Sequence, residues 1–227
     1  MNEILFLAFF CTLASLVLVA ARLGKVFLFA LVGILSILMN LFVVKPFVLF
    51  GFEIYGGNAI YGCIFLATDL LAENFSKRDA LKAVQVSLLS LLVYFFASFF
   101  FVHIAVNPGA ESSSQIQNAF ETIFAPAWQI VIASLAAFSA SNFFDVHFFH
   151  FLKKKTGDKF LWLRSNLSTT VSQSIDTLVF TGLASFFGIF QWEFFWQIVG
   201  FNLLFKILIA LLDTPFLYFS KFKFRKS

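Results

Sequence analysis

The chain has 227 residues, of which 60% are hydrophobic and only 12% are charged, and its mean hydropathy is +0.91. Soluble domains are about half apolar and about a quarter charged, so this composition excludes an ordinary soluble protein and indicates a membrane protein. The net charge of +4 would suit a protein that binds nucleic acid, but the positions of the cations along the chain exclude that class.

Seven apolar segments are each long enough for a helix that crosses a bilayer core, which takes about 20 residues. The runs lack the alternation of outer-membrane strands, and a helix satisfies its own backbone hydrogen bonds in lipid. We therefore predict an all-α polytopic membrane protein, a single integral membrane domain over residues 1–227 with about seven transmembrane helices. The predicted segments are about 4–21, 26–44, 57–75, 82–106, 124–151, 165–188 and 194–218.

Two connections are longer than the others. Residues 45–56 (KPFVLFGFEIYG) are apolar enough for an interfacial or re-entrant piece. Residues 107–123 are expected to be a loop that begins with the turn signal Asn107-Pro108-Gly109. Neither is large enough for a soluble domain, so the membrane domain must contain the whole function.

The cations occur in alternate connections. Of the 16 Lys and Arg residues, 14 lie between segments one and two, three and four, or five and six, or after segment seven. The positive-inside rule then predicts that the N-terminus is outside and the C-terminus is cytoplasmic. The cations are therefore topology determinants, which excludes nucleic acid as a partner. The basic tail KFKFRKS is expected to contact the lipid bilayer.

Charged residues inside the segments are candidates for function, because a charge within the bilayer costs several kcal/mol. In segment three, Asp69 and Glu73 are four residues apart and share one helix face, and Lys77 is a candidate partner of Glu73. In segment five, Asp145 lies near two histidines. No Cys or Glu completes a metal shell there, so we predict no metal site.

One face of segment six is polar. At 100° per residue its polar side chains fall within an arc of about 60°, and apolar side chains take the opposite side. Close helix packing accounts for small hydroxyl residues, but not for Gln173 and Asp176 near the middle of the bilayer. We therefore predict that this face lines a cavity. It consists of Ser165, Thr169, Ser172 and Asp176, with Gln173 beside them.

Segment seven contains Lys206 near its middle and Asp213 two turns later. A lone buried charge recruits a partner, so Lys206 is expected to pair with either Asp176 or Asp213. Segment two adds Asn40 as a weaker candidate. Helices two, three, five, six and seven are thus expected to converge on one polar interior that suits a small, polar, hydrogen-bonding solute.

The sequence contains no Walker motif, no Gly-rich phosphate loop, no HExxH and no GxSxG. We therefore predict that the protein is not an enzyme and needs no cofactor.

Several blocks resemble the queuosine precursor transporter family, of the vitamin-uptake-transporter type. The resemblance implies uptake of 7-deazaguanine bases (preQ0, preQ1 or queuine) across the bacterial cytoplasmic (inner) membrane for tRNA modification. It also implies that residues 26–218 form a six-helix core similar to substrate-binding components of energy-coupling-factor transporters, with 4–21 as an extra N-terminal helix. The matching blocks are FLATDLLAENF (65–75), FFDVHFFHFLKK (143–154), LSTTVSQSIDTLVF (167–180) and, more loosely, NLLFKILIALLDTPF (202–216).

A purine-like base suits the predicted cavity. Asp176 is expected to accept from N1–H and the 2-amino group, and Gln173 to contact O6 or N3. A phenylalanine or Trp128 is expected to stack on the ring. Asp145 or Asp69 is the expected partner of a cationic aminomethyl group. The further candidates for substrate binding are Lys206, Ser172, Thr169, Glu73 and Asn40.

The sequence leaves alternatives open. The main one is a substrate-binding component for a related vitamin-like solute that works with a separate energising module. Coupling to protons or ions through Asp69 or Asp145, facilitated diffusion, a homodimer and the choice among the three bases also stay open.

Overall fold

The computed structural model describes residues 1–42, 45–55, 57–107, 113–124, 128–157 and 159–224. Among these residues the chain forms eight α-helices, a short 3-10 helix (η1, Trp192–Phe194) and one two-stranded sheet. The helices are α1 (Asn2–Leu23), α2 (Lys25–Phe42), α3 (Gly57–Asn74), α4 (Lys77–His103), α5 (Ser113–Phe124), α6 (Trp128–Thr156), α7 (Leu161–Phe186) and α8 (Phe195–Phe224).

Seven of these helices coincide with the seven predicted segments, so the expected all-α polytopic fold is confirmed. Within the described part of the chain, five helical segments are long and apolar enough to cross a membrane: α1, α2, α4, the segment that contains α6, and α8. The other two, α3 and α7, are less apolar because both contain buried polar side chains. The protein is therefore a multi-pass membrane protein, and among the described helices α7 has the most buried polar residues.

Helix α3 is the centre of the bundle. Every residue from Ala59 to Ala72 is buried, and the helix contacts α1, α2, α4, α6 and α8. Small residues permit such close approach in membrane helices. A Cβ atom at Gly62 would lie only 2.4 Å from the Cγ2 atom of Ile209, so α8 packs directly against the α3 backbone. This contact brings the polar residues of α8 to the centre of the molecule.

Helix α7 packs between α6 and α8 and turns its polar face toward them. The side chains of Ser165, Thr169, Ser172 and Asp176 are buried, whereas Leu167 on the opposite face is exposed. The predicted polar face of this helix is thus confirmed. The helix begins at Leu161, four residues before the predicted segment, which places Arg164 inside the helix rather than in the preceding loop.

The two long connections contain structure that the sequence did not predict. Strands β1 (Pro46–Leu49) and β2 (Phe52–Tyr55) form an antiparallel hairpin, and the two residues that join them, Phe50 and Gly51, have φ angles of 51° and 83°. Positive φ at both positions is what a two-residue hairpin turn of type I′ requires.

In the second connection, α5 replaces part of the expected loop, and its Gln117 donates to the Val102 carbonyl at 2.9 Å. The turn predicted at Asn107-Pro108-Gly109 lies largely outside the described residues, since 108–112 are not among them.

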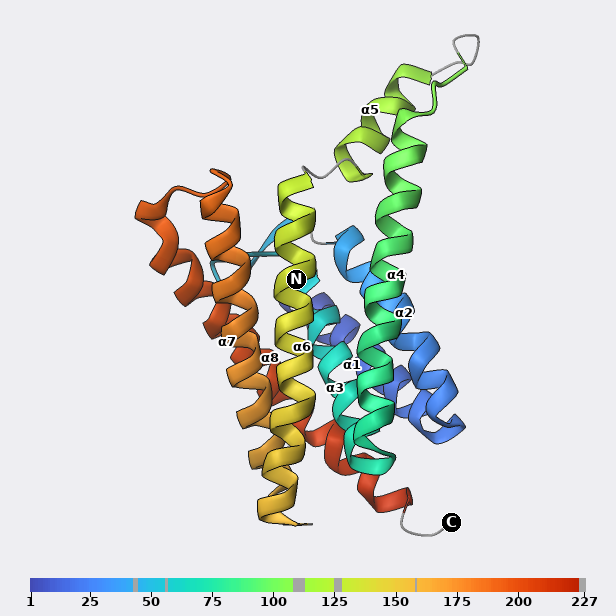
Figure 1. Cartoon of the computed structure of the whole chain (residues 1–227), viewed down its shortest axis with the longest axis vertical. Helices are drawn as coiled ribbons and strands as arrows, with labels where there is room; N and C mark the ends of the chain where they lie inside the picture. Colours follow the sequence, from blue (N-terminus) through green and yellow to red (C-terminus); the bar gives the residue numbers. More distant parts are fainter. Residues whose placement is uncertain (43–44, 56, 108–112, 125–127, 158, 225–227) are drawn as a thin grey trace.

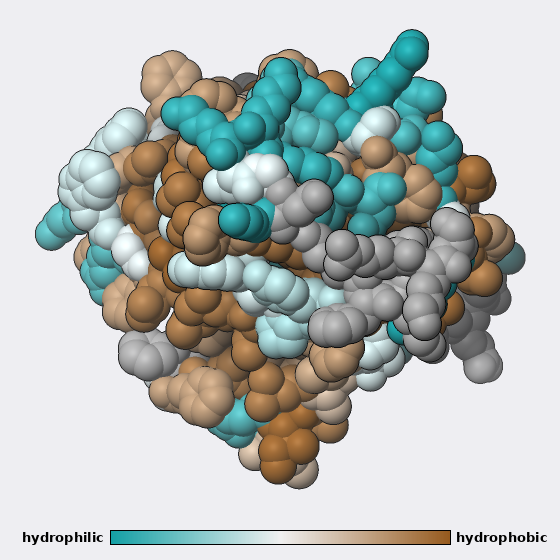
Figure 2. Space-filling model, turned by 90° about the horizontal axis from the view of Figure 1, so that it is seen from below, coloured by the Kyte–Doolittle hydropathy of each residue, from teal (hydrophilic) through white to brown (hydrophobic). Residues whose placement is uncertain are grey.

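The alternating cations gather at one end of the bundle. The chain runs toward the lower end of Figure 1 in α1, α3 and α6 and away from it in α2, α4 and α7. The α1–α2, α3–α4 and α6–α7 connections therefore lie toward the same end. Viewed from that side, hydrophilic side chains gather over the upper part of the face, and hydrophobic ones cover much of the left and lower part (Figure 2). We call this the basic end. Its cations include Arg22, Lys25, Lys77, Arg78, Lys82, Lys153, Lys154, Lys155 and Lys159.

The close contact between α3 and α8 predicts a specific stability effect. Gly62→Ala should lower the free energy of unfolding by about 1–3 kcal/mol. The added Cβ would collide with the Cγ2 atom of Ile209, which can move away only if the Ile209 side chain changes rotamer. The measurement is unfolding of the purified protein in detergent micelles. Gly182→Ala in α7 is the matched control, because no atom lies within 4 Å of its added Cβ. Equal stability of the two variants would contradict this packing.

Candidate functional site

Asp176 of α7 is the centre of a buried polar cluster formed by four helices. Its Oδ2 atom pairs with the ammonium group of Lys206 from α8 at 2.5 Å. Its Oδ1 atom accepts from the hydroxyl of Tyr61 in α3 at 2.8 Å and of Ser141 in α6 at 3.4 Å. One ammonium group and two hydroxyl donors thus compensate the charge of the Asp176 carboxylate inside the membrane domain.

Lys206 makes two further contacts. Its Nζ atom donates to Thr177 Oγ1 at 3.2 Å and lies 5.1 Å from the centre of the Tyr61 ring, over its face. The side chains of Lys206 and Asp176 are each only 10% exposed. An ammonium group has three N–H donors, and Asp176 and Thr177 accept from two of them.

A large cavity opens above this cluster, in the half of the bundle away from the basic end. Its volume is about 1130 Å³, and Asp176, Lys206 and Tyr61 lie at its inner limit. We call it the vestibule. Its wall includes the aromatic residues Tyr94, Phe95, Phe138, Phe180 and Phe205 and the amides Asn40, Gln197 and Asn202. An apolar, aromatic wall with a few polar groups is typical of a site for a small organic molecule.

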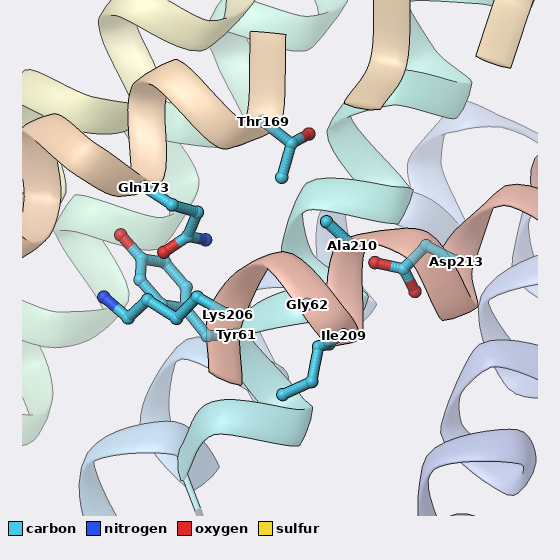
Figure 3. Close-up of a pocket in the computed structure, with 8 residues that line it drawn as sticks. All are labelled: Tyr61, Gly62, Thr169, Gln173, Lys206, Ile209, Ala210 and Asp213. Carbon is cyan, nitrogen blue, oxygen red and sulfur yellow. The ribbon is translucent and has the colours of Figure 1, made fainter. Parts of the chain in front are cut away.

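A second space continues from the cluster toward the basic end. We call it the inner pocket; in this conformation it has no room for a water molecule. Figure 3 shows Gln173 beside Tyr61 and Lys206 at one side of it and Asp213 at the other. The Oε1 atom of Gln173 and the Oδ1 atom of Asp213 are buried and make no hydrogen bond to the described residues. The lining residues are Tyr61, Gly62, Thr169, Gln173, Lys206, Ile209, Ala210 and Asp213.

Two more carboxylates face α7 beyond the inner pocket. Asp69 of α3 accepts a hydrogen bond from Ser165, and Asp145 of α6 accepts one from Ser172 at 3.0 Å. Hydroxyl groups are weaker partners for a carboxylate than a cation is. Neither Asp69 nor Asp145 belongs to the walls of the vestibule or the inner pocket.

Glu73, Lys153 and Arg164 close the basic end of this polar column, and we call them the basic-end cluster. The Glu73 carboxylate lies 2.5 Å from Arg164 Nη2 and 3.2 Å from Lys153 Nζ. The Arg164 side chain is fully buried, and its Nη1 atom donates to the Gly157 carbonyl at 2.6 Å. The cluster joins α3, α6 and α7, and it replaces the Glu73–Lys77 pair that the sequence suggested.

The predicted site residues occupy successive levels of one column. Asp176 and Lys206 meet at the vestibule floor, Gln173 and Thr169 line the inner pocket, and Asn40 lines the vestibule. The hydroxyl of Ser172 binds Asp145, while Asp69 and Glu73 lie farther toward the basic end. Trp128 begins α6, but its side chain lies outside what the structure describes.

Sequence reasoning missed Tyr61, Ser141 and Arg164 as members of the site. Tyr61 lies eight residues before Asp69, a spacing that belongs to one broad helix face, so its hydroxyl was a usable signal. Arg164 gave no such signal. In the sequence it follows the lysines of the α6–α7 connection, and only the start of α7 at Leu161 places it inside a helix.

The sequence of the chain is similar to those of known proteins. A family model described as "Putative vitamin uptake transporter" matches residues 55–220. A "Probable queuosine precursor transporter" of Bacillus subtilis (strain 168) is 37% identical over 200 residues, which cover 87% of this chain and 85% of that protein.

A protein of the same name from Haemophilus influenzae is 29% identical over 166 residues, 72% of this chain and 66% of that protein, slightly less than two thirds of its length. No solved structure matches the chain, so the expected likeness to energy-coupling-factor components stays a prediction.

The Lys206–Asp176 pair predicts a non-additive effect on stability. Lys206→Met should lower the free energy of unfolding by about 3–5 kcal/mol, because it leaves the Asp176 carboxylate buried without its cation. The double variant Lys206→Met/Asp176→Asn should regain much of that loss, since no charge remains. Unfolding of all four proteins in one detergent gives the coupling energy. Additive losses would contradict a direct pair.

Proposed function

The chain belongs to the vitamin uptake transporter family, and on that basis we propose that it imports queuosine precursors, 7-deazaguanine bases, across the bacterial cytoplasmic membrane for tRNA modification. Both relatives described above are named as transporters of these precursors. The observation that best supports the proposal in the structure is the Lys206–Asp176 pair at the floor of the vestibule.

The chemistry of a deazaguanine edge suits this floor. The edge presents an O6 acceptor next to the N1–H and 2-amino donors. The remaining N–H of Lys206 can donate to O6, while the Asp176 carboxylate and the unpartnered Oε1 atom of Gln173 can accept from the donors. Tyr61 and Phe138 stack at 5.9 Å with 21° between their planes and offer an aromatic wall for a flat ring.

The arrangement of spaces supports a direction of transport. With the N-terminus outside, the basic end is cytoplasmic and the vestibule opens to the outside. The closed inner pocket and the basic-end cluster then block the inward path, as alternating access requires of an outward-facing state. A base leaves the vestibule floor when the inner pocket opens, and a cationic aminomethyl substituent then passes Asp145 and Asp69.

This function is tested by complementation. The chain is expressed in cells that neither make nor import the base, preQ0, preQ1 and queuine are supplied separately, and queuosine in tRNA is assayed. We expect queuosine with at least one base. Asp176→Asn should reduce uptake about tenfold or more, because a hydrogen bond to a charged group contributes about 1.5–3 kcal/mol.

Asp79→Asn is the matched control, because Asp79 pairs with Lys25 at the basic end, away from the vestibule. It should leave uptake unchanged. Absence of queuosine with every base, in cells whose membranes contain the wild-type protein, would contradict the proposed function.

A further inference from the structure

Three buried carboxylates lack a cation, although every other buried carboxylate in the column has one. Asp69, Asp145 and Asp213 are 2%, 1% and 6% exposed, and none of them makes an ion pair within the part of the chain that the structure describes. We call them the carboxylate trio. They belong to α3, α6 and α8, and they lie between the vestibule floor and the basic-end cluster.

Among the described residues, no cation of the surrounding helices forms an ion pair with the trio. Asp69 interacts electrostatically with Asp145, Asp213 and Glu73, all of which are acidic. Among the cations of the packed helices, Arg164 of α7 and Lys153 of α6 pair with Glu73. Lys206 of α8 pairs with Asp176, Lys25 of α2 pairs with Asp79 of α4, and Arg22 of α1 is exposed.

The trio also has unfilled hydrogen-bonding capacity. The Oδ1 atoms of Asp69 and Asp213 are buried and make no hydrogen bond to any described residue. The Oε1 atom of Gln173, which lines the inner pocket together with Asp213, has none either. A charged carboxylate in this environment needs a positive partner, and a free carboxyl oxygen can take a proton instead.

The positions of the oxygens favour a proton over a metal ion. A hard metal cation needs about six oxygens that converge on one point. The hydroxyls that serve Asp69 and Asp145 come from Ser165 and Ser172, which lie about two turns apart on α7. The two carboxylates thus bind separate hydroxyls rather than a common centre.

We propose that the carboxylate trio, with Asp69 at its centre, binds the proton whose inward movement drives uptake of the base. The proposal rests on the proposed function. When the inner pocket is open to the vestibule, one proton from the outer solution reaches Asp213 in the pocket wall and passes to an Asp69 carboxylate oxygen. The same proton leaves for the cytoplasm when the basic-end cluster opens. One neutral base and one proton move inward in each cycle, so the cycle transfers one positive charge.

The test uses the full-length protein in liposomes without ATP or any other protein. The probe is radiolabelled preQ0, a neutral base, so that any charge movement reports the proton. With the interior one pH unit more alkaline and the membrane potential clamped at zero, we expect about tenfold accumulation for one proton per base. Without a potential clamp, uptake should generate an interior-positive potential.

Substitutions separate the proton from the base. Asp69→Asn should abolish accumulation driven by the pH gradient but preserve exchange of labelled for unlabelled preQ0, which needs no net proton movement. Asp69→Glu should retain accumulation, and Asp79→Asn should match the wild type. Asp176→Asn should impair exchange and accumulation together, because it alters base binding.

Three results would overturn the proposal. The first is base exchange by the wild type without any response to the pH gradient. The second is accumulation that follows a Na⁺ gradient instead. The third is retention of gradient-driven accumulation by Asp69→Asn. The first two are measured on the unaltered protein and do not depend on folding of the variants. Absence of exchange with preQ0, preQ1 and queuine would overturn the proposed function itself.

Discussion

The structure depends on the requirement that a charge inside a membrane domain must be compensated. Lys206 of α8 meets Asp176 of α7 at 2.5 Å, and Tyr61 of α3 and Ser141 of α6 complete the shell of the carboxylate. Four helices are thereby tied at one point near the middle of the bundle. The polar face of α7 must turn inward to reach these partners, and its apolar face is then left for neighbours and lipid.

The same face of α7 runs along the whole of the proposed transport path. From the vestibule toward the basic end it presents Asp176, then Gln173 and Ser172, then Ser165 and Arg164. Asp176 is ion-paired beside the vestibule, and Gln173 borders the closed inner pocket. Arg164 forms an ion pair with Glu73. A base and a proton that move along this helix face would both be stopped by the closed inner pocket and the basic-end cluster. Because the same opening would release both, their movements can be coupled.

Much of this could be predicted from the sequence because membranes impose simple rules. Segment length, the alternation of cations and the one-sided polarity of residues 165–176 depend only on the local sequence and the bilayer. The choice of Asp176 rather than Asp213 as the partner of Lys206 depends on how α7 and α8 pack against each other. The burial of Arg164 depends on where α7 begins. Tertiary packing decides both, as it does the hairpin at residues 46–55.

The floor of the vestibule is the proposed binding site of the base. The most direct test is an experimental structure, determined by electron microscopy, of the protein saturated with a 7-deazaguanine base. We expect density for the base at the inner limit of the vestibule, with its donor edge at hydrogen-bonding distance from Asp176 and its O6 atom near Lys206. A base bound elsewhere, with the Lys206–Asp176 pair and its surroundings untouched, would contradict this claim.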